Sequence, residues 1–161
     1  MKTDVTPISN LVLDKYLGKW YEIARIDNRF ERGISNAVAE YSLNSDGTIK
    51  VVNSGVDIKT GRLKRAVGKA KATLISGLLR VSFFWIFYSD YRVLALDENY
   101  KWALVGGGSS KYLWILSRTP ILPEEELMLV KNFMMGSILM LNRMYSIRFL
   151  PIRNFGKITV K

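Results

Sequence analysis

The side chains that most enzymes use for nucleophilic or metal chemistry are missing from this sequence. It contains no histidine and no cysteine, which excludes Ser-His-Asp triads, cysteine nucleophiles, disulfides, haem ligation through histidine and the usual zinc sites. The remaining carboxylates, lysines, tyrosines and serines support acid–base chemistry or bind a hard cation through oxygen, but their types alone identify no reaction. We therefore expect a binding protein that is not an enzyme, with no cofactor and no metal site.

Positive charge is concentrated in one segment of the chain. Lysine and arginine number 24 against 14 acidic residues, a net charge of +10, and no acidic residue interrupts the segment 59–80. Its cations are Lys59, Arg62, Lys64, Arg65, Lys69, Lys71 and Arg80. Such a segment either contacts phosphate, acidic lipid or another anionic surface, or forms a solvated strand face. Nucleic acid is an alternative partner, but we expect none, because this segment lacks aromatic residues for base stacking.

Short strands must position these side chains. A chain of 161 residues is long enough for one domain, here residues 1–161, and too short for two comfortable ones. From Gly18 onward, apolar and polar residues alternate in short runs separated by glycine-containing turns. The predicted strands are 18–27, 36–44, 48–56, 62–73, 78–86, 91–97, 101–106 and 111–118. They predict an all-β fold, an eight-stranded up-and-down antiparallel barrel over about residues 18–118.

A helix packed outside the barrel is predicted after the last strand. Apolar residues occupy both faces of the strand 111–118, so its outer face needs a cover. Pro123, followed by the glutamates at 124–126, is typical of a helix start. Within the helix and tail 121–161, residues 127–141 are apolar on nearly every side, which favours a homodimer, contact with a membrane surface or cargo exchange. Residues 156–161 could add a short final strand.

The chain shows no membrane span and no targeting segment. Its apolar stretches fall far short of the ~20 residues that a membrane-spanning helix requires. The polar, proline-containing start is unlike a signal peptide, and there is no cysteine for lipid attachment. We expect a soluble, unanchored chain that is a monomer or a homodimer through its apolar C-terminal segment.

Candidate ligand-binding residues are those that strand alternation points toward the barrel interior. Small side chains on one wall and aromatic ones on the other predict an elongated apolar cavity, although such barrels can also be filled by their own side chains. Arg65 or Arg80 near the rim could pair with a carboxylate or phosphate. The inward-facing set is Ala39, Tyr41, Val51, Asn53, Ala66, Val81, Phe83, Tyr91, Val93, Trp102, Leu104, Tyr112 and Trp114.

Three short motifs, in order and spacing, carry a family resemblance. They are Gly18-Lys19-Trp20 at the first strand, Asp97-Glu98-Asn99-Tyr100 between the sixth and seventh, and Arg118 after the eighth. Together they resemble the three conserved blocks of the lipocalin family. The longer segments 20–25, 29–33, 81–84, 95–97 and 112–120 resemble the bacterial, apolipoprotein-D-like branch of that family. The resemblance covers roughly residues 10–123.

The resemblance implies a function and a location. Members of this branch bind fatty acids or lysophospholipids and are usually outer-membrane lipoproteins, so we expect a lipid-carrying protein of the cell envelope, in the outer membrane or periplasm. Sterols and haem-like tetrapyrroles would also suit an apolar pocket with a basic mouth. Anchored members attach lipid to a cysteine that this sequence lacks. Either removal of the N-terminal segment that carries it or a soluble relative of the anchored members would explain the difference.

Four signature residues are expected to serve the fold and not the ligand. Trp20 should fill the narrow end of the barrel, with the Arg118 guanidinium over its indole, a contact worth about 1–2 kcal/mol when desolvated. Gly18 should permit a close backbone approach where the barrel closes, and Asp97 should cap a turn.

A few lipocalins are enzymes, so an isomerase is a further alternative. Glu22 and Tyr41 are the acid–base candidates on the inner face. A buried, hydrogen-bonded carboxylate inside a barrel is more often structural, so we do not expect catalysis.

Overall fold

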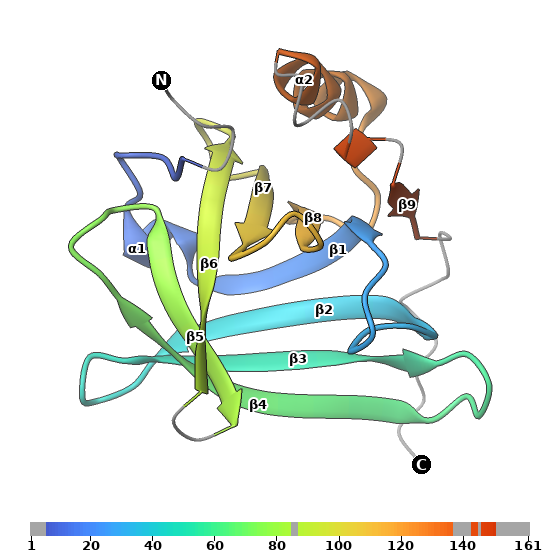
Figure 1. Ribbon diagram of the computed structural model, residues 1–161, viewed down its shortest axis with the longest axis horizontal. Helices are drawn as coiled ribbons and strands as arrows, with labels where there is room; N and C mark the ends of the chain where they lie inside the picture. Colours follow the sequence, from blue (N-terminus) through green and yellow to red (C-terminus); the bar gives the residue numbers. More distant parts are fainter. Residues whose placement is uncertain (1–5, 85–86, 137–142, 145, 151–161) are drawn as a thin grey trace.

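Eight antiparallel strands form where apolar and polar residues alternate between turns. The computed structural model describes residues 6–84, 87–136, 143–144 and 146–150. Each strand pairs with its neighbour in sequence, and the first pairs with both the eighth and the second, which closes the barrel (Figure 1). The strands are β1 Gly18–Ile26, β2 Ile34–Leu43, β3 Ile49–Asp57, β4 Leu63–Ala72, β5 Leu78–Phe84, β6 Phe87–Leu96, β7 Trp102–Gly107 and β8 Leu113–Ser117. The predicted fold class is confirmed.

Three elements differ from the predicted set. β6 begins at Phe87 and not at residue 91, because its pairing with β5 carries the strand beyond the alternating region. A short helix, α1 (Leu13–Tyr16), precedes the barrel. A ninth strand, β9 (Ile147–Phe149), pairs with β1 outside the barrel. The apolar run 138–141 and the final strand predicted at 156–161 lie outside the described residues.

The up-and-down topology sorts the connections between the two ends of the barrel. The β1–β2, β3–β4, β5–β6 and β7–β8 connections share one end, which we call the open end, and α1 lies at the other, the closed end. In Figure 1 the β1–β2 and β3–β4 connections lie at the right, whereas α1 and the β2–β3 connection lie at the left. The two ends therefore carry different loops.

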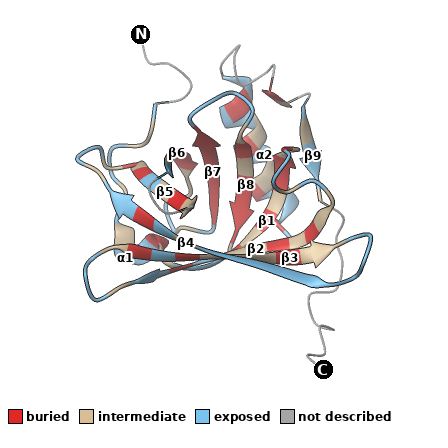
Figure 2. Ribbon diagram, turned by 60° about the horizontal axis from the view of Figure 1, so that its bottom comes forward, coloured by how far each residue is buried: buried red, intermediate tan, exposed pale blue. Residues whose placement is uncertain are grey.

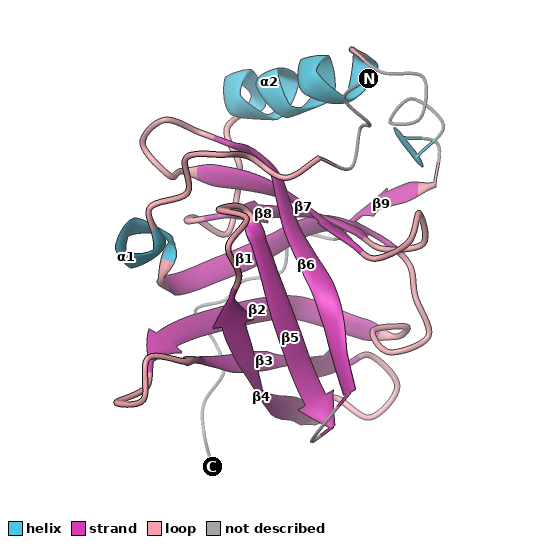
Figure 3. Cartoon of the chain, turned by 60° about the vertical axis from the view of Figure 1, so that its left-hand side comes forward, coloured by secondary structure: helices cyan, strands magenta, loops and turns pink. Residues whose placement is uncertain are grey.

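The predicted helix is present and covers one wall of the barrel. α2 (Glu124–Met135) follows Pro123, and the three glutamates of its first turn suit the positive end of the helix dipole. Its buried Val130 and Met134 pack in one apolar cluster with Leu113 and Ile115 of β8 (Figure 3). Both faces of β7 and β8 are consequently buried, whereas the β3–β4 hairpin is much more exposed (Figure 2). Within the described residues no helix has the length and apolarity needed to cross a membrane.

Candidate functional site

A tryptophan and an arginine plug the closed end. Trp20 is completely buried, and its indole Nε1 donates to the backbone oxygen of Tyr16 at 2.8 Å. The Arg118 guanidinium lies 3.8 Å from the centre of the indole ring. It also donates to backbone oxygens of Lys15, Tyr16, Lys19 and Tyr100. A rigid guanidinium that stacks and donates in several directions fixes this end of the barrel.

Gly18 begins β1, and Asp97 begins the β6–β7 turn, both at the closed end. Gly18 has a φ of +98°, and a Cβ there would lie 3.3 Å from Arg118 Nη1, so the guanidinium approaches the backbone closely. The Asp97 carboxylate accepts from the backbone N–H groups of Asn99 and Lys101. Asp97 thus caps the β6–β7 turn.

Three tyrosines form a polar but uncharged floor above the plug. The Tyr91 hydroxyl lies 2.6 Å from that of Tyr16 and 3.0 Å from that of Tyr41. Burial raises the pKa of all three phenols above the ordinary tyrosine value. The floor therefore offers hydroxyl groups to the interior and no charge.

The inner wall changes from buried to accessible between the floor and the open end. Val51 and Val93 are buried, whereas Ala39, Phe83 and Trp114 are half-buried. Cross-strand register places Trp20, Ala39, Asn53 and Ala66 in one row, and exposure rises along that row until Ala66 is exposed. Solvent therefore reaches the inner face from the open end.

The structure brings most of the predicted ligand residues together. Eight pack in the inner cluster, and Asn53 and Ala66 continue the Ala39 row, while Tyr112 stacks on Trp114 with 5.9 Å between ring centres. The eight are Ala39, Tyr41, Val51, Val81, Phe83, Tyr91, Val93 and Trp114.

Two predicted ligand residues face the other way. Trp102 and Leu104 belong to the cluster under α2, so their inward assignment is wrong, and Ala103 and Val105 take the inner positions of β7. All six β7 residues are buried, so alternation between apolar and polar residues could not distinguish the faces. Arg80 also lies away from the rim, because it is hydrogen-bonded to Asp90 on the outer wall.

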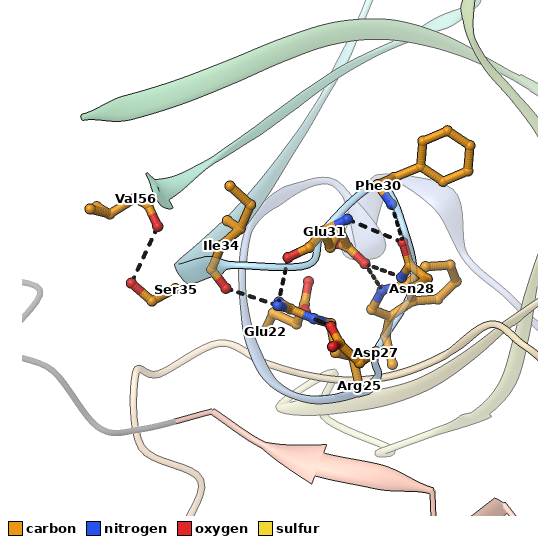
Figure 4. A network of polar contacts seen from close by, with 10 residues as sticks. Glu22, Arg25, Asp27, Asn28, Phe30, Glu31, Ile34, Ser35 and Val56 are labelled. Carbon is orange, nitrogen blue, oxygen red and sulfur yellow. Dashed lines mark hydrogen bonds and ion pairs between the residues drawn. The ribbon is translucent and has the colours of Figure 1, made fainter. Parts of the chain in front are cut away.

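A charged cluster lies in the interior near the open end (Figure 4). Arg25 is only 4% exposed, and its Nη1 donates to Glu22 Oε1 at 2.9 Å. Its Nη2 donates to the backbone oxygens of Glu31 and Ile34, each at 2.8 Å, which fastens the β1–β2 loop to the barrel wall. The Glu31 carboxylate accepts from the Trp114 indole at 2.9 Å. Hydrophobic patterning does not predict this cluster, because it combines a bulged strand with a loop.

Glu22 resists ionisation in this position. Burial raises the pKa of its carboxyl well above the ordinary value, the negative charge of Glu31 adds to the effect, and Arg25 opposes it. The folded protein then holds a proton that the unfolded chain releases at lower pH. The free energy of unfolding should therefore fall as pH rises from the ordinary glutamate pKa toward the raised one.

We expect Glu22→Gln to remove this contribution to the pH dependence. The amide mimics the protonated carboxyl, so the decline in the free energy of unfolding as pH rises above the ordinary glutamate pKa should become smaller than in the parent. Chemical denaturation at each pH measures it, with the exposed outer-face Glu40→Gln as control. An unchanged slope in Glu22→Gln would show that Glu22 is ionised throughout.

An open groove of about 610 Å³ lies beside strands β4 and β5, mainly on the outer wall. The exposed Lys69 and Lys71 line it, together with Tyr88, whose ring lies 4.7 Å from Lys71 Nζ. Phe83 of the inner face also lines the groove. The β4–β5 pairing reaches only from Ala72 to Lys69, so the groove begins where the two strands stop pairing. The groove places two lysine side chains beside the wall, but it is too open to enclose an apolar chain.

Among the residues that the structure describes, no cluster of acidic side chains could hold a metal ion. Sequence reasoning also missed inner-face residues. Leu116 could have been found from its alternation with Trp114, whereas Tyr16 enters from a helix of only four residues and left no periodic signal.

Comparisons with known proteins agree with this geometry. The model of the lipocalin-like domain family matches residues 11–137. The outer membrane lipoprotein Blc of Vibrio cholerae is 50% identical over 123 residues, which cover 74% of this chain and 72% of that protein. Bovine apolipoprotein D is 36% identical over 146 residues, covering 84% and 75% of the two chains.

Solved structures show the same fold at lower identity. Insecticyanin from the tobacco hornworm Manduca sexta superimposes with a TM-score of 0.77 at 20% identity, over 94% of this chain and 86% of its own. With the closed barrel, its Trp20–Arg118 plug and the outer helix, these matches show that the chain belongs to the lipocalin family.

Proposed function

We propose that this protein binds and carries one amphipathic lipid, a fatty acid or a lysophospholipid, inside its barrel and without chemical change. One observation carries the proposal: the inner wall is apolar yet becomes accessible toward the open end. The wall there combines the small side chains of Ala39 and Ala66 with the aromatic Phe83 and Trp114. An acyl chain fits such a wall, with the uncharged tyrosine floor at its far end.

The cell envelope is the proposed location. The Vibrio cholerae and Escherichia coli K12 relatives, 50% and 48% identical, are described as outer membrane lipoproteins. A lipid carrier in the envelope would exchange its cargo with nearby membranes. Contact between copies through the exposed Met128, Leu129 and Phe133 of α2 would make the protein a homodimer.

Binding suits the interior better than catalysis does. Of the two acid–base candidates, Glu22 is hydrogen-bonded to Arg25 and Tyr41 to Tyr91. Both groups are therefore engaged in contacts that stabilise the wall, and the raised pKa of the Tyr41 phenol keeps it neutral. These engagements support a carrier over an isomerase.

Native mass spectrometry of the protein purified from a bacterial host tests the proposal. We expect a bound species in about a one-to-one ratio, identified after denaturing extraction as a fatty acid or lysophospholipid. A protein that stays empty after incubation with both lipid classes would overturn the proposal. The same spectra separate monomer from dimer.

A further inference from the structure

We propose that the rim of the open end docks on a lipid bilayer that carries anionic headgroups. The rim presents large apolar side chains that nothing in the described structure covers: Phe30 is 61% exposed, and Ile58 and Leu63 are each 56% exposed. Phe87, at the start of β6, is 74% exposed at the same end. Apolar side chains clustered on the loops of the open end suit insertion into the headgroup region of a membrane. The closed end also exposes Leu74 and Ile75, so charge must distinguish the two ends.

The rim residues come from loops that are joined to one another. The backbone N–H of Ile58 donates to the Gly33 carbonyl at 2.9 Å, which links the β3–β4 loop to the β1–β2 loop that carries Phe30. Leu63 begins β4 opposite Val56 in the same hairpin. The Phe30 ring turns away from the interior cluster around Arg25 (Figure 4). These contacts hold the two loops as one surface.

Cations surround the apolar rim and remain available for a partner. Lys59, Arg62, Arg65 and Lys111 belong to the open-end loops or the adjacent strand start, and none forms an ion pair with another described residue. The Arg29 guanidinium lies 4.8 Å from the centre of the Phe30 ring, so a cation accompanies this aromatic side chain. A lysine or arginine near an anionic membrane surface is attracted to its headgroups.

The acidic residues of the open end are occupied by internal partners. Asp57 accepts from Lys64 at 2.9 Å, and Asp27 lies 3.6 Å from Arg25. Glu31 accepts from Trp114 in the interior. The closed end differs in its balance of charge, because Asp14, Asp46, Asp97 and Glu98 in its helix and turns offset the nearby Lys15 and Lys101. Charge therefore favours the open end as the side that meets an anionic surface.

Docking in this orientation deepens the proposed function. The mouth of the barrel would face the leaflet from which a lipid is taken or to which it is delivered. Only this role in lipid exchange rests on the proposed function, because docking itself is measured on vesicles without any barrel ligand.

Co-sedimentation of the full chain with vesicles tests the inference. We expect binding to vesicles of phosphatidylglycerol and phosphatidylcholine, little binding to phosphatidylcholine alone, and weakening as salt rises. Phe30→Ser combined with Ile58→Ser should lower the apparent affinity at least about tenfold, through lost apolar contact. Lys59→Glu combined with Arg62→Glu should have a similar effect and also reduce the salt dependence.

The closed end supplies a matched control. Leu74 is fully exposed and Ile75 is 54% exposed in the β4–β5 turn, so Leu74→Ser with Ile75→Ser removes a comparable apolar pair far from the rim. This control should keep parental binding, and near-ultraviolet circular dichroism should show all variants folded. Loss of binding in the control but not in the rim variants would overturn the inference, as would equal binding to neutral vesicles.

A separate titration distinguishes failure of docking from failure of the carrier function. The rim variants should still bind a fluorescent fatty acid in the absence of vesicles, because their substituted side chains lie outside the inner cluster. Retained fatty-acid binding with unchanged vesicle binding would refute docking alone. A parent protein that binds no fatty acid but still binds anionic vesicles would refute the carrier function alone.

Discussion

Replacing Trp20 with alanine should lower the free energy of unfolding by about 3–5 kcal/mol, the range for an aromatic-to-alanine change in a core. The indole is completely buried, and its centre lies 5.0 Å from the centre of the Tyr16 ring. The Arg118 guanidinium lies over the indole ring, 3.8 Å from its centre. Its removal leaves a cavity and takes the stacking partner from a cation that is tied to four backbone carbonyls. Urea denaturation measures the loss.

Arg118→Lys separates the charge of the plug from its geometry. Lysine keeps the positive charge but cannot reproduce a planar group that stacks and donates in several directions. We expect a smaller loss of about 1–2 kcal/mol, on the scale of a few hydrogen bonds. A lysine variant as stable as the parent would show that charge alone holds the plug. A Trp20→Ala variant with the parental free energy of unfolding would show that the closed end of the barrel forms without the indole.

Ala39→Trp should reduce fatty-acid affinity at least about tenfold, since filling a binding pocket with a bulky group removes several kcal/mol of apolar contact. Ala39 lies in the inner cluster, half-buried, in register between Trp20 and Asn53. A tryptophan there projects across the accessible part of the inner wall. Displacement of a fluorescent fatty acid measures the change, and the thermal midpoint shows whether the barrel remains folded.

Ser42→Trp is the matched control on the same strand. Ser42 is exposed and follows the inward-facing Tyr41, so alternation points it outward. This variant carries the same added volume and should retain parental affinity. If both variants bind like the parent, the ligand does not occupy the barrel interior near Ala39.

The prediction that the chain forms an eight-stranded barrel succeeded because turns and period-2 alternation are local signals. Glycine lies in five of the seven connections between predicted strands, and hairpin neighbours pair without long crossovers. The α2 helix was equally readable from Pro123 and the glutamates that follow it. Such signals concern a few consecutive residues and need no knowledge of distant contacts.

Face assignment failed where alternation carried no contrast. In β7 the outer residues Trp102 and Leu104 are as apolar as the inner Ala103 and Val105, because α2 buries the outer wall. In β1 the register with β8 shifts between Glu22 and Ala24. Ala24 consequently packs under α2, whereas Arg25 lies beside Glu22. A bulge changes which residues face inward, and no residue pattern in the strand announces it.

The sequence by itself determined the strands, the outer helix, the absence of histidine and cysteine chemistry, and the motif that resembles the lipocalins. Only the tertiary structure decided what the interior contains. The tyrosine floor joins α1, β2 and β6, and the charged cluster joins a bulged strand to the β1–β2 loop. These groups meet because the barrel closes, and contacts between residues far apart in the chain leave no local pattern from which they could be predicted.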